Sequence, residues 1–253
     1  MRYGSKPADG GYFILGDAQK AKLIAREPDV EKFIKPFMGS KEFINNIPRW
    51  CLWLNDITPH QLRELSGVLE RVEKVRKMRL ASKKSATVKD ADKPTLFTEN
   101  RQPDSNYLVV PEVSSENRKY IPMGYVDKEV IASNLIYTIQ NATIFHFGVL
   151  SSAMHMAWVR SVCGRLKSDY RYSAGIVYNN FPWPQAPTDK QQQAIEDAAQ
   201  AVLGARAKFP DSSLADLYDP LTMPPVLTSA HRRLDAAVDA AYAKRKFTGD
   251  SDR

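Results

Sequence analysis

The ten residues from Gly164 to Ser173, GRLKSDYRYS, interleave charges of both signs with two tyrosines. Arginine and lysine can hydrogen-bond a guanine edge or a phosphate, aspartate can accept from cytosine, and tyrosine offers a flat amphipathic surface. Such a mixture suits the reading of bases in duplex DNA better than positive charge alone does. The candidate base-reading residues are Arg165, Lys167, Asp169 and Arg171. The alternative is a ladder of surface ion pairs along a strand edge, and composition favours neither.

A second segment concentrates most of the formal net charge of the chain, which is +7. The stretch from Arg71 to Lys84 holds seven basic residues and one acidic residue, Glu73, an excess of six. A polar loop, 114–119, adds two further cations. The candidate phosphate-contacting residues of these two segments are Lys74, Lys77, Lys83, Lys84, Arg118 and Lys119. The alternatives are a solvated helix face for the first segment and a simple turn for the second.

Signs of catalysis are absent from the sequence. It contains no phosphate-cradling G-x-x-x-x-G-K and no G-x-G-x-x-G. The pair Pro224-Pro225 follows a methionine rather than Asn, Asp or Ser, which excludes the base-amination loop of an amino-methyltransferase. We therefore expect no catalytic residue and no metal site in this chain. The four histidines, which we expect to pack or hydrogen-bond, are His60, His146, His155 and His231.

Targeting signals are also missing. No apolar run approaches the roughly 20 residues of a membrane span, and the N-terminus lacks the apolar stretch of a secretory signal. Cys51 and Cys163 are far apart in sequence and lie in apolar surroundings, so we expect them to fill core volume. We expect a cytoplasmic protein with no membrane partner.

The first half of the chain predicts a strand at 12–15, a helix that Asp17 caps, and a strand over 49–54 that is buried on both faces. Thr58-Pro59 predicts the start of a helix. Apolar residues then recur every three or four positions, which predicts that this helix continues to about Ser82. The basic segment therefore lies on the second half of this helix.

From Pro94 to Leu150 the short β-branched and aromatic runs predict a meandering sheet. The strands expected there are 107–110, 120–126, 136–139 and 143–150. A helix is expected over 152–162 and another strand over 175–178. The segment FPWP at 181–184 forms a rigid joint, because its two prolines stiffen the chain and its aromatic residues anchor it.

Beyond the joint the pattern is helical, with a helix from Thr188 to near Phe209 and a last Ala-rich helix after the linker 219–225. The fold class is therefore α+β: a mixed sheet body with flanking helices to residue 187, followed by a small all-α region over 188–253.

Seven blocks in order along the chain resemble one kind of protein. They are GSKPADGG (4–11), FMGSKEFI (37–44), RWCLWL (49–54), SSAMHMAWVR (151–160), GRLKSDYRY (164–172), YNNFPWP (178–184) and SLADLYDP (213–220). Together they resemble the C-terminal part of MmeI-like DNA methyltransferases, which are single-chain restriction-modification enzymes and their methylase relatives. The resemblance runs from about residue 4 to about residue 245.

The resemblance implies a target recognition domain over 1–187 and a C-terminal helical domain over 188–253. It implies sequence-specific binding of double-stranded DNA for an adenine-N6 methyltransferase whose S-adenosylmethionine site lies in an upstream methyltransferase domain. We expect this chain to be a fragment that begins where that domain ends, and to hold no cofactor itself. The expected partners are double-stranded DNA and the upstream domain.

Two alternatives belong to other classes of protein. In a protein-interaction module, the C-terminal helices would dock a partner subunit and the basic helix would be only a solvated face. In an independent enzyme, the chain would bind S-adenosylmethionine by itself. Salt-dependent affinity for duplex DNA separates the first alternative from a recognition domain, and a cofactor-induced shift in melting temperature separates the second.

Overall fold

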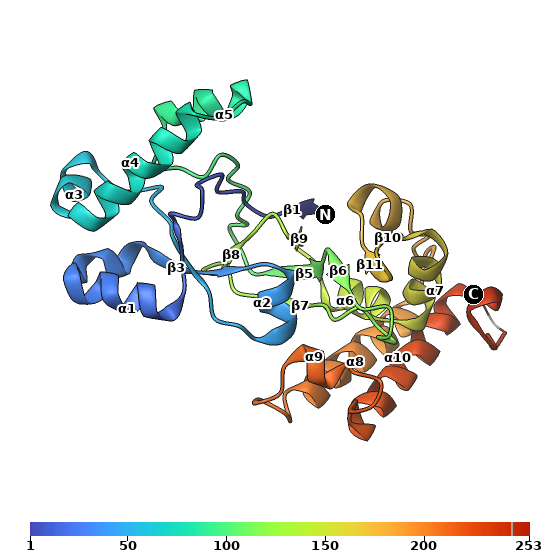
Figure 1. The fold of residues 1–253 in the computed structure, drawn as a ribbon. Coiled ribbons are helices and arrows are strands. Elements are labelled where there is room, and N and C mark those ends of the chain that lie inside the picture. Colours follow the sequence, from blue (N-terminus) through green and yellow to red (C-terminus); the bar gives the residue numbers. More distant parts are fainter. Residues whose placement is uncertain (244) are drawn as a thin grey trace.

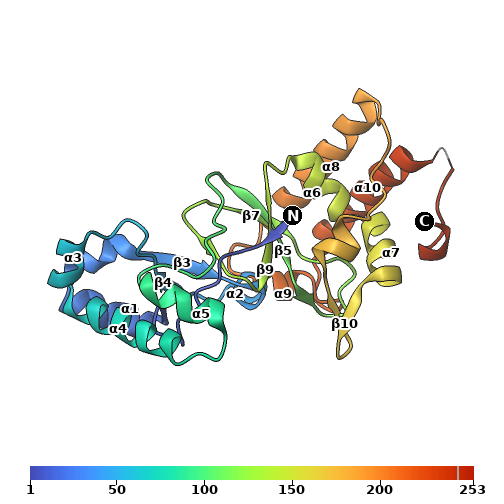
Figure 2. The same cartoon turned by 90° about the horizontal axis from the view of Figure 1, so that it is seen from above.

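The computed structural model describes residues 1–243 and 245–253 and confirms the α+β fold class. An N-terminal lobe carries the helices α1 (Asp17–Arg26), α3 (Pro59–Glu64), α4 (Ser66–Leu80) and α5 (Ser85–Lys89). A central antiparallel sheet separates this lobe from the C-terminal helices in both views (Figures 1 and 2). Within the described residues, no helix combines the length and the apolar character that a bilayer crossing requires.

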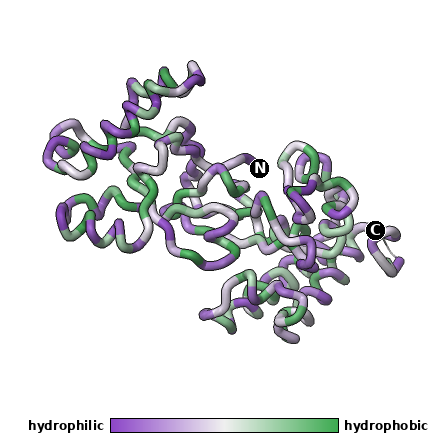
Figure 3. The backbone as a smooth tube through the Cα atoms, in the orientation of Figure 1, coloured by the Kyte–Doolittle hydropathy of each residue, from purple (hydrophilic) through white to green (hydrophobic). Residues whose placement is uncertain are grey.

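The N-terminal lobe is built on a sheet of strand order β2-β4-β3-β8. Its strands are β2 (Ile14–Leu15), β3 (Ile34–Met38), β4 (Trp50–Leu52) and β8 (Ile131–Ala132). A short helix, α2 (Ser40–Asn45), follows β3. The helices of the lobe alternate between hydrophobic and hydrophilic stretches (Figure 3), as expected for helices with one buried face.

The predicted single helix from Thr58 to Ser82 is wrong, because the chain breaks at Leu65 between α3 and α4. Thr58 caps α3 as expected, by accepting a hydrogen bond from the backbone N–H of Gln61. The second helix has its own cap, since the carboxylate of Glu27 accepts from the Ser66 hydroxyl at 2.8 Å and from the Gly67 N–H at 2.6 Å. A carboxylate from another segment thus satisfies the Gly67 N–H, one of the backbone donors that a helix start leaves free, and also holds the Ser66 side chain.

The central sheet has the order β1-β9-β5-β7, with every neighbouring pair antiparallel. It consists of β1 (Arg2–Tyr3), β5 (Tyr107–Pro111), β7 (Gly124–Val126) and β9 (Ile136–Gln140). Every residue of β5 is buried, so this strand is covered on both faces. Of the strand predicted over 120–126, only the last three residues form one.

Two further predicted strands are helical. The run 143–150 forms α6 (Ile144–Leu150), whose start is closed by the Thr143 N–H donating to Nδ1 of His146. The run at 175–178 lies in a π-helical turn, Ala174–Tyr178, capped by the Ser173 hydroxyl. Both runs are short and mostly apolar, and such runs lack the periodicity that distinguishes a strand from a buried helix.

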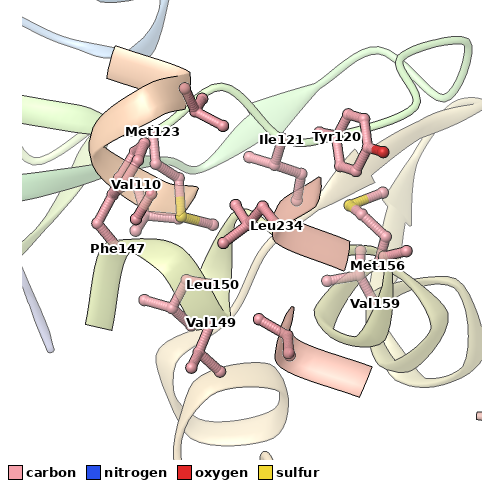
Figure 4. Packing of buried hydrophobic residues seen from close by; sticks show 14 of the residues in the cluster. Val110, Tyr120, Ile121, Met123, Phe147, Val149, Leu150, Met156, Val159 and Leu234 are labelled. Carbon is pink, nitrogen blue, oxygen red and sulfur yellow. The ribbon is translucent and has the colours of Figure 1, made fainter. Parts of the chain in front are cut away.

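The C-terminal helices share one hydrophobic core with the central sheet (Figure 4). They are α7 (Ala153–Val162), α8 (Asp189–Arg206), α9 (Leu214–Leu217) and α10 (Pro225–Tyr242). Leu108 of β5, Val202 of α8 and Leu234 of α10 belong to the same cluster, and each is fully buried. The core therefore continues across residue 187. Trp183 of the predicted joint packs edge-on against Phe181 and His146, which agrees with an anchoring role.

Candidate nucleic-acid interface

The candidate base-reading segment folds as a β-hairpin at the end of α7. Its strands are β10 (Gly164–Leu166) and β11 (Asp169–Arg171), paired with Leu166 opposite Asp169. Lys167 stands in the two-residue loop with a φ of 57°, in the left-handed region. The hairpin extends away from the body of the molecule (Figure 2). On its inner side, β11 pairs with β6 (Val113–Ser114), which immediately precedes the polar loop 115–119.

Arg165 lies flat on the hairpin. Its guanidinium carbon is 4.1 Å from the centre of the Tyr170 ring, and Nη1 donates to the Ser168 carbonyl at 2.9 Å. Nη1 also lies 3.7 Å from a carboxylate oxygen of Glu116. The side chain is exposed, but stacking and these partners fix its orientation.

Asp169 and Arg171 point to the same face of β11, because side chains alternate along a strand. Arg171 Nε lies 3.3 Å from Oε1 of Glu112, while Asp169 accepts a hydrogen bond from the Glu116 N–H. The alternative of a ladder of ion pairs is wrong in one respect, because it does not run within the segment: the carboxylates that pair with Arg165 and Arg171 come from Glu116 and Glu112. Ion pairs nevertheless exist at both arginines.

The two tyrosines of the segment do not offer a surface for contact with DNA, contrary to expectation. Tyr170 is 4% exposed and Tyr172 is 1% exposed. The Tyr172 hydroxyl shares a hydrogen bond of 3.0 Å with Nε2 of His155, and burial raises the pKa of this tyrosine. These rings anchor the hairpin to the core and leave the charged side chains outside.

The basic helix offers fewer free cations than its sequence indicates. Arg79 is fully buried, and its guanidinium donates to five backbone carbonyls, those of Pro7, Ala8, Asp90, Lys93 and Leu96. Arg71 is partly buried and donates to the carbonyl of Tyr12. Lys74 is exposed and pairs with Glu70 one turn earlier. Lys77 lies exposed on α4, and Lys83 and Lys84 lie exposed in the turn before α5.

The structure brings some of the predicted residues together and separates others. The loop that carries Arg118 and Lys119 meets the hairpin through the contacts of Glu116 with Arg165 and Asp169. The lysines of α4 and of the turn before α5 belong to the N-terminal lobe, on the other side of the central sheet (Figures 1 and 2). A ligand that touches both sets must be extended.

A groove of about 490 Å³ lies beside the hairpin, between α2, the segment 112–118 and Asp169. Lys41 and Asn45 of α2 expose their side chains at its wall, and Arg118 lines it from the loop. Neither Lys41 nor Asn45 is among the candidate residues that the sequence indicates. Lys41 belongs to the block FMGSKEFI, one of those on which the family resemblance rests, and that was the available signal.

Two family models match successive parts of the chain. The sequence profile of the MmeI target recognition domain matches residues 1–185, and that of the MmeI C-terminal domain matches residues 187–253. The chain belongs to the MmeI family. It is also similar to DNA methyltransferase A of Bacillus subtilis (strain 168), with 41% identity over 253 residues. That match covers all of this chain and 29% of the relative.

A solved structure of the MmeI family is also similar to this chain. It is the Type IIL restriction-modification enzyme MmeI in complex with DNA, with 49% identity and a TM-score of 0.96. The match covers 99% of this chain and 33% of MmeI. The chain thus spans about a third of the length of the relatives it matches.

Proposed function

We propose that this chain is the sequence-specific recognition region of an adenine-N6 DNA methyltransferase of the restriction-modification type. The observation that carries the proposal is its likeness, at a TM-score of 0.96 over nearly the whole chain, to a restriction-modification enzyme solved on DNA. Its partners in this proposal are double-stranded DNA and a methyltransferase domain of the parent protein. That domain would bind S-adenosylmethionine, and the protein would act in the cytoplasm.

The mechanism has two parts. Exposed lysines, Lys77, Lys83 and Lys84 among them, supply salt-dependent affinity by neutralising phosphates and fix the register of the duplex. Side chains of the projecting hairpin, Asp169 and Arg171 first, read base edges in the major groove. A duplex held in one register allows the methyltransferase domain to extrude the target adenine into its own pocket.

The apolar faces of the C-terminal helices argue against a protein-interaction module. Ile195 and Val202 of α8 and Leu227, Leu234 and Val238 of α10 are fully buried within this chain. These side chains are therefore already covered, because α8 and α10 pack against each other and against α6 and share one core with the central sheet. Within the described residues they are not available to a partner subunit.

The proposal is tested with a pool of random-sequence duplexes at low and physiological salt. Fluorescence anisotropy measures binding, and the duplexes retained by the protein are then separated and sequenced. Retention that falls with salt and enriches one asymmetric site supports a recognition region. Retention without enrichment contradicts sequence reading by this chain, and no retention at low salt favours the interaction module. In the same samples, S-adenosylmethionine should leave the melting temperature unchanged, because its site lies in another domain.

A further inference from the structure

Arg118 is a partly buried cation in the groove beside the hairpin, and its protein partners leave most of its donors unused. Its Nε is buried and has no hydrogen-bond partner in the described residues. Nη1 lies 3.5 Å from the Ser114 hydroxyl, at the long limit for a hydrogen bond. Within the same residues, no carboxylate oxygen lies within 4.0 Å of this guanidinium. Burial lowers the pKa of Arg118, and the carboxylates of Asp169 and Asp219 offset this only in part.

The three carboxylates of the groove are already engaged. Glu42 pairs with Arg49 at 3.0 Å, and Glu112 pairs with Arg171 at 3.3 Å. Asp169 accepts from the Glu116 N–H. An arginine presents five N–H donors in a fixed fork, so Arg118 retains donors that the protein itself does not use.

The charge of the groove lining favours a base edge over a phosphate as the acceptor for Arg118. Three cationic side chains line it, and three carboxylates line it too, so the formal charge of the lining cancels. A phosphate would gain little there, because the carboxylates of the lining offset the attraction of its cations. A base edge is uncharged and carries acceptors and donors side by side, which suits a lining of both signs.

We propose that Arg118 reads a base edge with two adjacent acceptors, such as O6 and N7 of guanine, in the groove between α2 and the hairpin. This inference rests on the proposed function. It revises the sequence interpretation, in which Arg118 was a phosphate contact. It also extends the set of base-reading residues from the hairpin to the polar loop that follows β6, the strand that pairs with β11.

Selection from a random duplex pool tests the assignment with wild type, Arg118→Ala and Arg118→Lys. Lysine keeps the charge but not the planar fork, so it can replace arginine at a phosphate and makes only a weaker and less selective contact at a guanine. We expect Arg118→Ala to bind the wild-type site roughly tenfold to a hundredfold more weakly and Arg118→Lys to lose less, and both variants to enrich sites degenerate at one base pair. Binding to random duplexes should change at most a few-fold for Arg118→Ala and remain near wild type for Arg118→Lys.

Lys119→Ala is the matched control, because Lys119 is the exposed neighbour in the same loop. It should lower affinity for cognate and random duplexes by the same factor. Melting temperatures of all variants establish that they fold. Equal loss of cognate and random binding in Arg118→Ala with recovery in Arg118→Lys would identify a phosphate contact and overturn the inference. Unchanged selection in both variants would overturn it too. A wild-type chain that enriches no site would instead contradict the proposed function, and the assignment of Arg118 with it.

Discussion

The Tyr120 hydroxyl donates a 2.6 Å hydrogen bond to Oδ2 of Asp235, although the two residues are 115 positions apart. The other carboxylate oxygen accepts from the N–H of Ala153, the first residue of α7, at 2.7 Å. Asp235 on α10 therefore holds both the segment after the polar loop and the start of the helix that leads into the hairpin. Burial raises the pKa of this carboxyl group.

Removal of the Asp235 carboxylate should destabilise the fold. Asp235→Ala leaves the Ala153 N–H and the Tyr120 hydroxyl without partners, and we expect a loss of about 2 to 4 kcal/mol in the free energy of unfolding. Asp235→Asn should lose less, because its amide oxygen can still accept from Ala153. Urea unfolding measures both, and a loss below about 1 kcal/mol in the alanine variant would contradict the role given to this pair.

Arg79→Met should be among the most damaging substitutions in the N-terminal lobe. It leaves five backbone carbonyls without their donors, for an expected loss on the order of 3 to 5 kcal/mol in the free energy of unfolding. Arg76→Ala is the control, since Arg76 is exposed on the same helix and should change stability by less than about 0.5 kcal/mol. If both variants unfold at the same urea concentration as wild type, the buried guanidinium does not organise the lobe.

Stability should fall as the pH falls from 7.5 to 5.5. Burial lowers the pKa of His155 to about 3, whereas the unfolded chain titrates near 6.5. Between these values the unfolded state binds more protons than the folded state. The free energy of unfolding therefore decreases on acidification, by about 1 kcal/mol from this residue over the interval. Burial shifts the pKa of His231 in the same direction, and the raised pKa of Asp235 acts in the opposite one.

The readout for His155 is a difference between two pH profiles of urea unfolding. His155→Asn should have a shallower decline than wild type by about 1 kcal/mol over this interval, whatever its absolute stability. Parallel profiles would mean that the imidazole already titrates in the folded protein.

Base readers and phosphate-binding lysines should differ in their effect on DNA binding. Arg171→Ala is expected to weaken binding of the cognate site by about 1 to 3 kcal/mol and of random duplexes much less. Joint replacement of Lys74 and Lys77 by alanine should weaken both about equally and reduce the salt slope by about 1 for each phosphate that a lysine no longer neutralises. Anisotropy titrations at several salt concentrations measure both quantities. If the two variants weaken cognate and random binding in the same proportion, Arg171 is not a base reader.

Local signals predicted the helices with strong caps and the class of the fold. The capping boxes at Thr58 and Thr188 start helices where the sequence indicates, because the donors and acceptors that they satisfy lie within three residues. The ordered blocks along the chain also predicted its family. Two MmeI family models confirm that prediction over nearly the whole length of the chain.

The sequence by itself thus determined which segments are helical at their caps, where charge is concentrated, and to which family the chain belongs. Only the tertiary structure decided that Arg79 is buried, that Tyr170 and Tyr172 anchor rather than contact, and that Glu27 starts a second helix at Ser66. Burial and long-range hydrogen bonds depend on segments far away in the chain. Residue type and spacing do not show such partners. The sequence therefore does not distinguish an arginine on a solvated helix face from one that is buried among five backbone carbonyls.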